Sequence, residues 1–264
     1  MADPHIAVVL IRAAGRGFPV WTEGANPGAG AARQALSDLC RLVETAEKPV
    51  VVALHGLAVG PVLELALAAP ARIADAGARI GLPDVTLGLL PGAGTQRLPR
   101  LIGAEQALRL LLTGRGISAA EALALGLLDR VVEEALPDAA LAMARDLAGR
   151  RLTATRDRRD GLRDGLVYQR AVAAARSRLE GSRLPAPGRI VDCVEAAQLL
   201  PSSKAWSMRR PPSKISVPRP KRRPCAMCNW PNGLPRGFLR LRWFRACRPA
   251  PCAAWAFWVP RPRT

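Results

Sequence analysis

The chain has 264 residues and a net charge of +18, which would suit a nucleic-acid-binding protein if the charge were evenly spread. The charge is instead concentrated in residues 202–264, which hold fifteen Lys/Arg and no Asp or Glu. Residues 1–201 hold 24 basic and 21 acidic residues, a net charge of +3. Cys40 and Cys193, the two cysteines before residue 202, are too few for a disulfide framework. With no signal-peptide pattern and no run of 18 apolar residues, we expect a cytoplasmic protein that does not enter a membrane.

Short apolar runs alternate with segments of helical periodicity along residues 1–201. Ile6–Ile11 and Pro49–Leu54 are β-branched runs, typical of strands buried on both faces of a parallel sheet. Ala32–Ala46, between them, has its leucines at helical spacing. Further elements are expected in this order: a helix start at Leu63–Ala69, strands at Arg72–Ala76 and Arg79–Leu82, helices at Ala104–Leu112 and Ala119–Ala124, a strand at Leu127–Val132, and helices at Leu136–Ala148 and Val167–Leu179. Strands that alternate with helices predict an α/β fold.

The stretch Lys48–Val132 contains several uncommon motifs in a fixed order. They read KPVVVALHG, GPVLELALAAPARIADA, GLPDVTLGLLPGAGTQRLPRLIG and LLTGRGISAAEALALGLLDRVV. Together they resemble the enoyl-CoA hydratase/isomerase (crotonase) family. The resemblance implies a spiral of repeated ββα turns followed by C-terminal helices. We therefore expect a crotonase core in residues 1–133, a helical segment in 134–201 and a disordered basic tail in 202–264.

Two carboxylates carry the chemistry that the resemblance implies. Family members act on the thioester of an acyl-CoA, whose carbonyl becomes an enolate-like oxyanion, and acid/base groups beside it add water or move a proton. Glu64, in LELA, matches the first family carboxylate, and Asp84, in LPDVTLG, matches the second, where hydratases carry Glu. Because Asp is one methylene shorter, its carboxylate is displaced by roughly 1 Å, which can cost ~10²-fold in rate. Pro83 and Gly92 match positions that bind the substrate.

Two backbone N–H groups should form the oxyanion hole. Ile11–Glu23 resembles the first oxyanion loop of the family, and the two donor positions match Thr22 and Pro61. Trp21 stands where the family has Gly, and proline at position 61 has no backbone N–H to donate. The loss of one such donor costs on the order of 3 kcal/mol of transition-state stabilisation. A one-residue shift that presents the Gly60 N–H instead is the alternative, although proline also restricts the residue before it.

The resemblance implies an enoyl-CoA hydratase, a lyase of fatty-acid β-oxidation that adds water to trans-2-enoyl-CoA. An enoyl-CoA isomerase is one alternative. A catalytically dead acyl-CoA-binding remnant, or a pseudogene product, is another, because Pro61 and Asp84 both depart from the hydratase pattern. The implied partner is an acyl-CoA thioester, with coenzyme A as part of the substrate and no separate cofactor or metal. The chain could also form a homo-oligomer. Its oligomeric state stays open, since stand-alone family members tend to be trimer-based and fused ones often are not.

The segment Pro187–Pro201, PGRIVDCVEAAQLLP, resembles the connection in fused enoyl-CoA hydratase/3-hydroxyacyl-CoA dehydrogenases. The match stops at its end, where the composition changes: five of six Trp and four of six Cys follow. In a shifted frame with G/C-rich codons, Ser202–Ile215 permits FEGLVDEAAAFEDL, similar to the acidic, Ala-rich helices with which such fusions continue. We therefore hypothesise a frameshift near codon 201 and expect residues 202–264 to be out of frame and largely disordered.

The start of the chain also departs from the family, whose members have a strand and a helix before the run Ile6–Ile11. Without that strand, we expect one edge of the sheet to be exposed. Two other interpretations of the tail were weighed. One is a zinc site at Cys225, Cys228, Cys247 and Cys252. The other is a basic arm, which would bind nucleic acid only non-specifically unless it were selected for that role.

Overall fold

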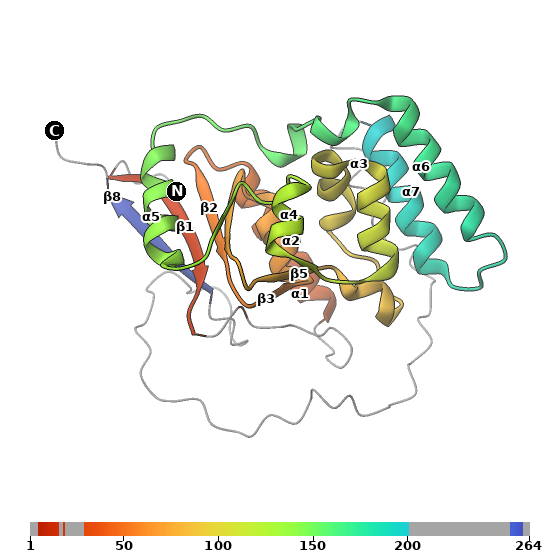
Figure 1. The fold of residues 1–264 in the computed structure, drawn as a ribbon, viewed down its shortest axis with the longest axis horizontal. Helices are drawn as coiled ribbons and strands as arrows, with labels where there is room; N and C mark the ends of the chain where they lie inside the picture. Colours follow the sequence, from red (N-terminus) through yellow and green to blue (C-terminus); the bar gives the residue numbers. More distant parts are fainter. Residues whose placement is uncertain (1–4, 16–17, 19–28, 201–253, 261–264) are drawn as a thin grey trace, which may run out of the picture. The chain divides into compact units, whose positions relative to one another are not determined.

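The computed structural model describes residues 5–15, 18, 29–200 and 254–260 (Figure 1). The strands are β1 (Ile6–Ala13), β2 (Val50–Leu54), β3 (Leu57–Val59), β4 (Ala71–Asp75), β5 (Arg79–Gly81), β6 (Ile117–Ser118), β7 (Arg130–Val132) and β8 (Ala254–Pro260). The α-helices are α1 (Ala29–Glu44), α2 (Pro61–Ala68), α3 (Gly94–Thr113), α4 (Ala119–Ala124), α5 (Leu136–Leu147), α6 (Gly165–Arg178) and α7 (Pro185–Leu199). Three 3₁₀ helices are also present: η2 (Pro83–Leu87), η3 (Thr155–Asp157) and η4 (Asp160–Leu162).

The strands form two sheets. The larger has the order β7-β4-β2-β1-β8, with parallel pairing throughout except between β1 and β8. The smaller has the order β3-β5-β6, in which β3 and β5 are parallel and β6 is antiparallel. Parallel strands need crossover connections, and the helices between them supply these. The predicted α/β fold is therefore confirmed.

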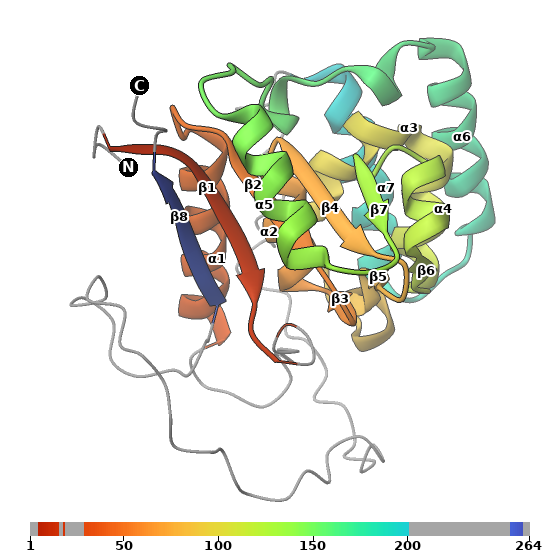
Figure 2. The same cartoon turned by 60° about the vertical axis from the view of Figure 1, so that its left-hand side comes forward.

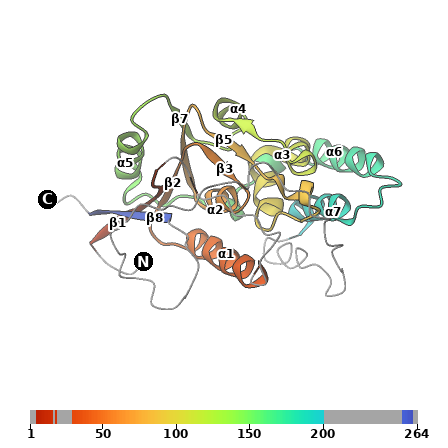
Figure 3. The ribbon, with the colours of Figure 1, turned by 90° about the horizontal axis from the view of Figure 1, so that it is seen from below.

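Both faces of the larger sheet are buried, as the apolar runs predicted. Along β1, Val9 packs with the core that contains α1 and α2, whereas Val8 and Leu10 pack with α5. Val52 and Val51 of β2 divide in the same way. Helix α5 lies over one face of the sheet (Figure 2) and α1 over the other (Figure 3). The period of two along each strand thus places alternate residues in two separate cores.

Strand β8 covers the edge of β1 that the sequence predicted to be exposed. Its seven residues run antiparallel to β1, with Trp258 opposite Val9 and Phe257 opposite Leu10. The expectation of an exposed edge was therefore wrong, because a segment from the end of the chain pairs with β1 and occupies its backbone hydrogen-bonding groups. The expected disorder of the tail does not apply to these seven residues. The rest of residues 202–264, with the four tail cysteines, lies outside the described residues, and the frameshift stays a prediction.

Deletion of residues 254–264 is expected to destabilise the fold by about 2–3 kcal/mol, because β1 loses its cross-strand partners on one side. For a chain of this size, that corresponds to a fall in Tm of roughly 5–10 °C. Thermal unfolding followed by circular dichroism measures it. Deletion of residues 261–264 alone is the control and should leave Tm within about 1 °C. Equal melting temperatures for all three chains would show that β8 does not support the sheet.

Helix α3 organises the C-terminal half, because α6, α7 and η4 all pack against it (Figure 1). It begins at Gly94 instead of at the predicted Ala104, with a kink at Gly103, where φ is 77°. Pro99 and Gly103 interrupted the helical periodicity in the sequence and hid the first half of this helix. The predicted helix at 119–124 is present, and Ser118 caps its start: Ser118 Oγ accepts a hydrogen bond from the Glu121 N–H at 3.2 Å.

The C-terminal segment of residues 134–200 contains α5, α6 and α7, with η3 and η4 between α5 and α6. The helix predicted at 167–179 is present as α6, whereas the Arg-rich stretch before it forms only η3 and η4. The segment that resembled a connection between domains is itself the helix α7, which packs on α3. Among the described helices, none combines the length and the apolar character that a membrane crossing requires.

Candidate functional site

Glu64 lies in the first turn of α2, immediately beyond the loop that follows β3. Its side chain is buried, with 4% of its surface exposed. Its Oε2 accepts a hydrogen bond from the Ala93 N–H at 2.8 Å. A methyl group on Gly92 would lie 3.1 Å from the same oxygen, so any larger residue there would force the carboxylate to shift slightly. The predicted catalytic Glu64 and the predicted substrate-binding Gly92 are therefore neighbours in space.

A buried ion pair fixes the turn that holds Glu64. The Arg97 guanidinium of α3 donates from Nε and Nη2 to the two carboxylate oxygens of Glu44, at 2.9 and 2.8 Å. Both side chains are almost fully buried. Arg97 also donates from Nη1 to the Ala93 carbonyl at 3.5 Å, and the N–H of that residue is the donor to Glu64. The end of α1 is thus tied through α3 to the turn beside the carboxylate.

A second contact holds the backbone of Glu64. The Cys40 thiol of α1 lies 3.6 Å from the Glu64 carbonyl oxygen, in hydrogen-bonding position. Sequence reasoning missed Glu44, Arg97, Ala93 and Cys40 as positioning residues. The separation of 53 residues between Glu44 and Arg97 left no local signal for their pairing.

The oxyanion position at α2 has lost its expected donors. Pro61 is the first residue of α2 and has no N–H. The alternative donor, Gly60, is not available either, because its N–H donates to the Gly81 carbonyl at 2.9 Å, beyond the end of the β3–β5 pairing. In this conformation the Gly60 hydrogen is bonded within the sheet, and the role of Gly60 as a substitute donor stays a prediction. Trp21 and Thr22, with the first oxyanion loop, lie outside the described residues.

Asp84 and Pro83 lie in η2, on the chain that follows β5. The Asp84 carbonyl accepts the Leu89 N–H at 3.0 Å, which closes the turn after η2. Leu82, next to Pro83, packs so closely on Gly94 that a Cβ there would lie 2.5 Å from its Cδ1. Gly92 therefore lies against the Glu64 carboxylate, and Gly94 lies against Leu82, at the start of the segment that carries Asp84. The turn at 92–94 brings these two segments to one place.

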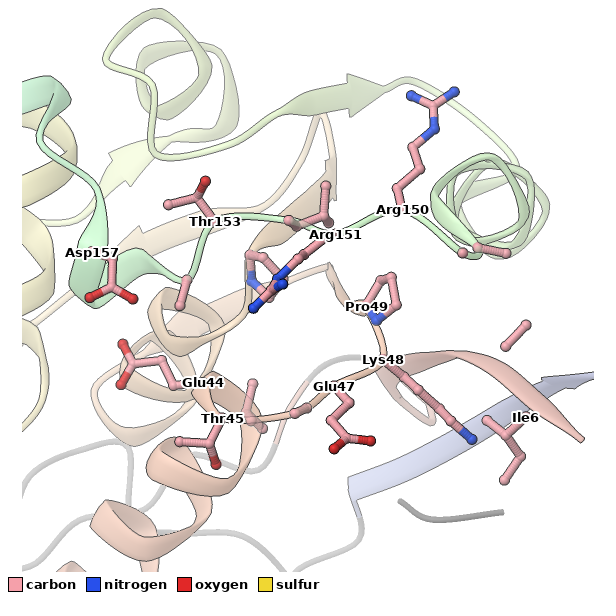
Figure 4. Close-up of a pocket in the computed structure, with 18 of the residues that line it drawn as sticks. Ile6, Glu44, Thr45, Glu47, Lys48, Pro49, Arg150, Arg151, Thr153 and Asp157 are labelled. Atoms are coloured by element: carbon pink, nitrogen blue, oxygen red, sulfur yellow. The ribbon is translucent and has the colours of Figure 1, made fainter. Parts of the chain in front are cut away.

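A cavity of about 1610 Å³ lies elsewhere in the fold (Figure 4). Ile6 and Pro49 in its wall mark the amino ends of β1 and β2, whereas Glu64 lies beyond the carboxyl end of β2. Lys48, Arg151 and Glu47 give its wall a mixed charge, and Arg150 points away from the other labelled side chains (Figure 4). None of the predicted site residues lines this cavity. It is therefore separate from the predicted site residues, although the supporting residue Glu44 lies in its wall.

A family model described as enoyl-CoA hydratase/isomerase matches residues 11–177. The chain belongs to the enoyl-CoA hydratase/isomerase family. The peroxisomal bifunctional enzyme of Danio rerio is 44% identical over 209 residues, which cover 75% of this chain and 28% of that enzyme. The fatty acid oxidation complex subunit alpha of Shewanella loihica is 39% identical over 162 residues, covering 58% of this chain and 23% of that subunit. This enoyl-CoA hydratase/isomerase chain thus spans about a quarter of the length of these curated relatives.

Solved structures confirm the predicted crotonase fold. A putative enoyl-CoA hydratase/isomerase from Mycobacterium abscessus has a TM-score of 0.52 and 30% identity, covering 74% of this chain and 81% of that one. The enoyl-CoA hydratase from Bacillus anthracis has a TM-score of 0.50 and 30% identity, covering 75% of each chain. This family member is therefore an enoyl-CoA hydratase-like domain related to the multifunctional enzymes of β-oxidation. The Danio rerio relative is named as a peroxisomal enzyme, and the cellular location of this chain stays a prediction.

Proposed function

We propose that this domain binds acyl-CoA thioesters and hydrates trans-2-enoyl-CoA slowly, with Glu64 and Asp84 as the acid/base pair. The observation that carries the proposal is the Glu64 carboxylate, which is buried at the start of α2 and held by the Ala93 N–H. A carboxylate oriented in this way can deliver or accept a proton beside a bound thioester. The family membership supplies the substrate class.

Slow turnover follows from the oxyanion position. A thioester carbonyl placed at the start of α2 would face Pro61, which has no hydrogen to donate, and Gly60, whose N–H is already bonded. Stabilisation of the enolate would then rest on the loop that contains Thr22. The absence of one donor costs about 10²–10³ in kcat, so the hydration rate should stay below ~1% of that of a normal hydratase.

Two measurements on the full chain test this proposal. Calorimetric titration with butyryl-CoA, a saturated thioester that cannot be hydrated, should show saturable binding at one site. Turnover of crotonyl-CoA, followed by the loss of enoyl-thioester absorbance, should be slow and should fall further in Glu64→Gln. The matched control is Glu105→Gln, an exposed glutamate of α3, which should bind and turn over as the wild type does.

The outcomes separate the alternatives. Binding without any turnover would leave an acyl-CoA-binding remnant. Conversion of a trans-3-enoyl-CoA with no hydration would indicate an isomerase. Hydration at the speed of a normal hydratase would refute the inference drawn from Pro61, and absence of thioester binding would refute the proposed substrate class.

A further inference from the structure

A second feature of interest is Arg100, a buried arginine of α3. Its side chain is only 5% exposed. Its Nε and Nη2 atoms have no hydrogen-bond partner among the residues that the structure describes. A buried charged group without a partner is strongly unfavourable, so such a group normally signals a ligand or a counter-ion. Nε and Nη2 form one edge of the guanidinium, the geometry that binds two oxygens of a carboxylate or phosphate side by side.

The 3₁₀ segment of η3 and η4 is packed tightly against α3 beside Arg100. A Cβ on Gly161 would lie 2.2 Å from both the Pro99 carbonyl oxygen and the Gly103 nitrogen, so only glycine allows this approach. The approach occurs at the kink of α3, where Gly103 leaves the helical conformation. The arginines of η3 and of the turn after it are therefore held next to Arg100 by close backbone contact.

Arg100, this segment and the end of α7 line a cavity of about 540 Å³. The lining residues are Arg100, Arg156, Asp157, Arg159, Leu162, Ala197, Gln198, Leu199 and Leu200. The lining therefore includes three arginines and one aspartate, a net charge of +2. The Asp157 carboxylate lies 3.5 Å from Nε of Arg156 and accepts no hydrogen bond from Nε or Nη2 of Arg100.

The chain beyond α7 has no acidic side chain with which to neutralise this charge. Residues 201–264 contain no Asp or Glu. Burial lowers the pKa of Arg100, and the nearby Arg159 lowers it further, although Tyr168 and Asp157 oppose this. An anion in the cavity would offset both effects and stabilise the charged form of Arg100.

We propose that this cavity is a binding site for a phosphate dianion, with two phosphate oxygens on Nε and Nη2 of Arg100 and with Arg156 and Arg159 at its sides. The charge of a phosphate dianion equals the excess charge of the lining. None of the residues assigned to the thioester site lines this cavity, so the proposal stands independently of the proposed function. The phosphate can be free or can belong to a larger ester.

The melting temperature of the full chain tests this proposal in two arms at constant ionic strength. One arm replaces chloride by 10 mM inorganic phosphate, and the other by adenosine 3′,5′-bisphosphate, a nucleotide with two phosphate esters. A ligand present at about ten times its Kd raises Tm by roughly 3–5 °C in a chain of this size. A larger shift with the nucleotide would identify a phosphate ester as the source, and a larger shift with inorganic phosphate would identify the free ion.

Arg100→Met should abolish the phosphate-dependent shift and should melt in chloride at or above the wild-type temperature, because it removes an unpaired buried charge. Arg159 is exposed, so the Arg159→Gln variant should fold normally. Its apparent Kd for phosphate should be raised about 3–10-fold. Arg170→Gln, an exposed arginine of α6, is the matched control for general anion effects and should keep the full shift. A wild type that neither anion stabilises, or an Arg100→Met variant that keeps the wild-type shift, would overturn the proposal.

Discussion

Replacement of Pro61 by glycine is expected to raise the rate of crotonyl-CoA hydration by about 10²–10³-fold, the factor that one oxyanion donor contributes. The reason lies at the first position of α2, where proline removes the N–H that would otherwise point at the thioester oxygen. The neighbouring Gly60 N–H cannot take over, since it is bonded to the Gly81 carbonyl. Glycine at position 61 restores a donor without adding a side chain. Initial rates at saturating substrate measure the gain.

The control for this substitution is Pro185→Gly. Pro185 is the first residue of α7, so the change has the same helical context as at position 61, but it lies on an exposed surface. Both variants should lose a similar small amount of stability, about 1 kcal/mol, through greater freedom of the unfolded chain. Only the change at position 61 should alter hydration. A folded Pro61→Gly variant with the wild-type rate would remove Pro61 as the cause of slow turnover.

Glu44→Ala is expected to destabilise the protein by about 3–5 kcal/mol, because it leaves the buried Arg97 guanidinium without its counter-charge. The two hydrogen bonds of this pair join α1 to α3, and the exposed fractions of the side chains, 2% for Glu44 and 0% for Arg97, exclude water as a substitute. The melting temperature should fall by roughly 10 °C or more. Urea-induced unfolding gives the free energy directly.

The matched control is the exposed pair of Asp38 and Arg41, whose atoms lie 3.7 Å apart. Asp38→Ala should cost less than about 1 kcal/mol, the usual value of a surface ion pair. The double variant Glu44→Met/Arg97→Met should recover most of the loss, because two apolar groups of similar volume remove the buried charges together. If Glu44→Ala and Asp38→Ala cost the same, the buried pair does not support the fold.

The sequence allowed local features to be predicted well. The apolar runs of β1 and β2 identified strands buried on both faces, and the helix predicted at 119–124 has the bounds of α4. The helix α3 was only half predicted, because proline and glycine inside it look like a turn in the sequence. Its kink proved to be a packing feature, since η4 lies against it through Gly161.

Long-range features could not be predicted in this way. Strand β8 pairs with β1 across more than 240 residues, and nothing in its local sequence specified a partner. The site shows the same division: the family motifs gave Glu64 and Gly92, which do lie together, whereas the support from Arg97 became visible only in three dimensions. The bonded N–H of Gly60 likewise depends on the distant β5 strand. Contacts between separate segments decide these points.

The most direct test of the proposed mechanism is the hydration rate of Pro61→Gly compared with that of the double variant Pro61→Gly/Glu64→Gln, at equal concentrations of folded protein. If the Glu64 carboxylate acts on a thioester held at the start of α2, the rate gained by the first substitution should be lost in the double variant, by at least ~10²-fold. A double variant that keeps the full gain would contradict the assignment of Glu64 and the placement of the substrate at α2.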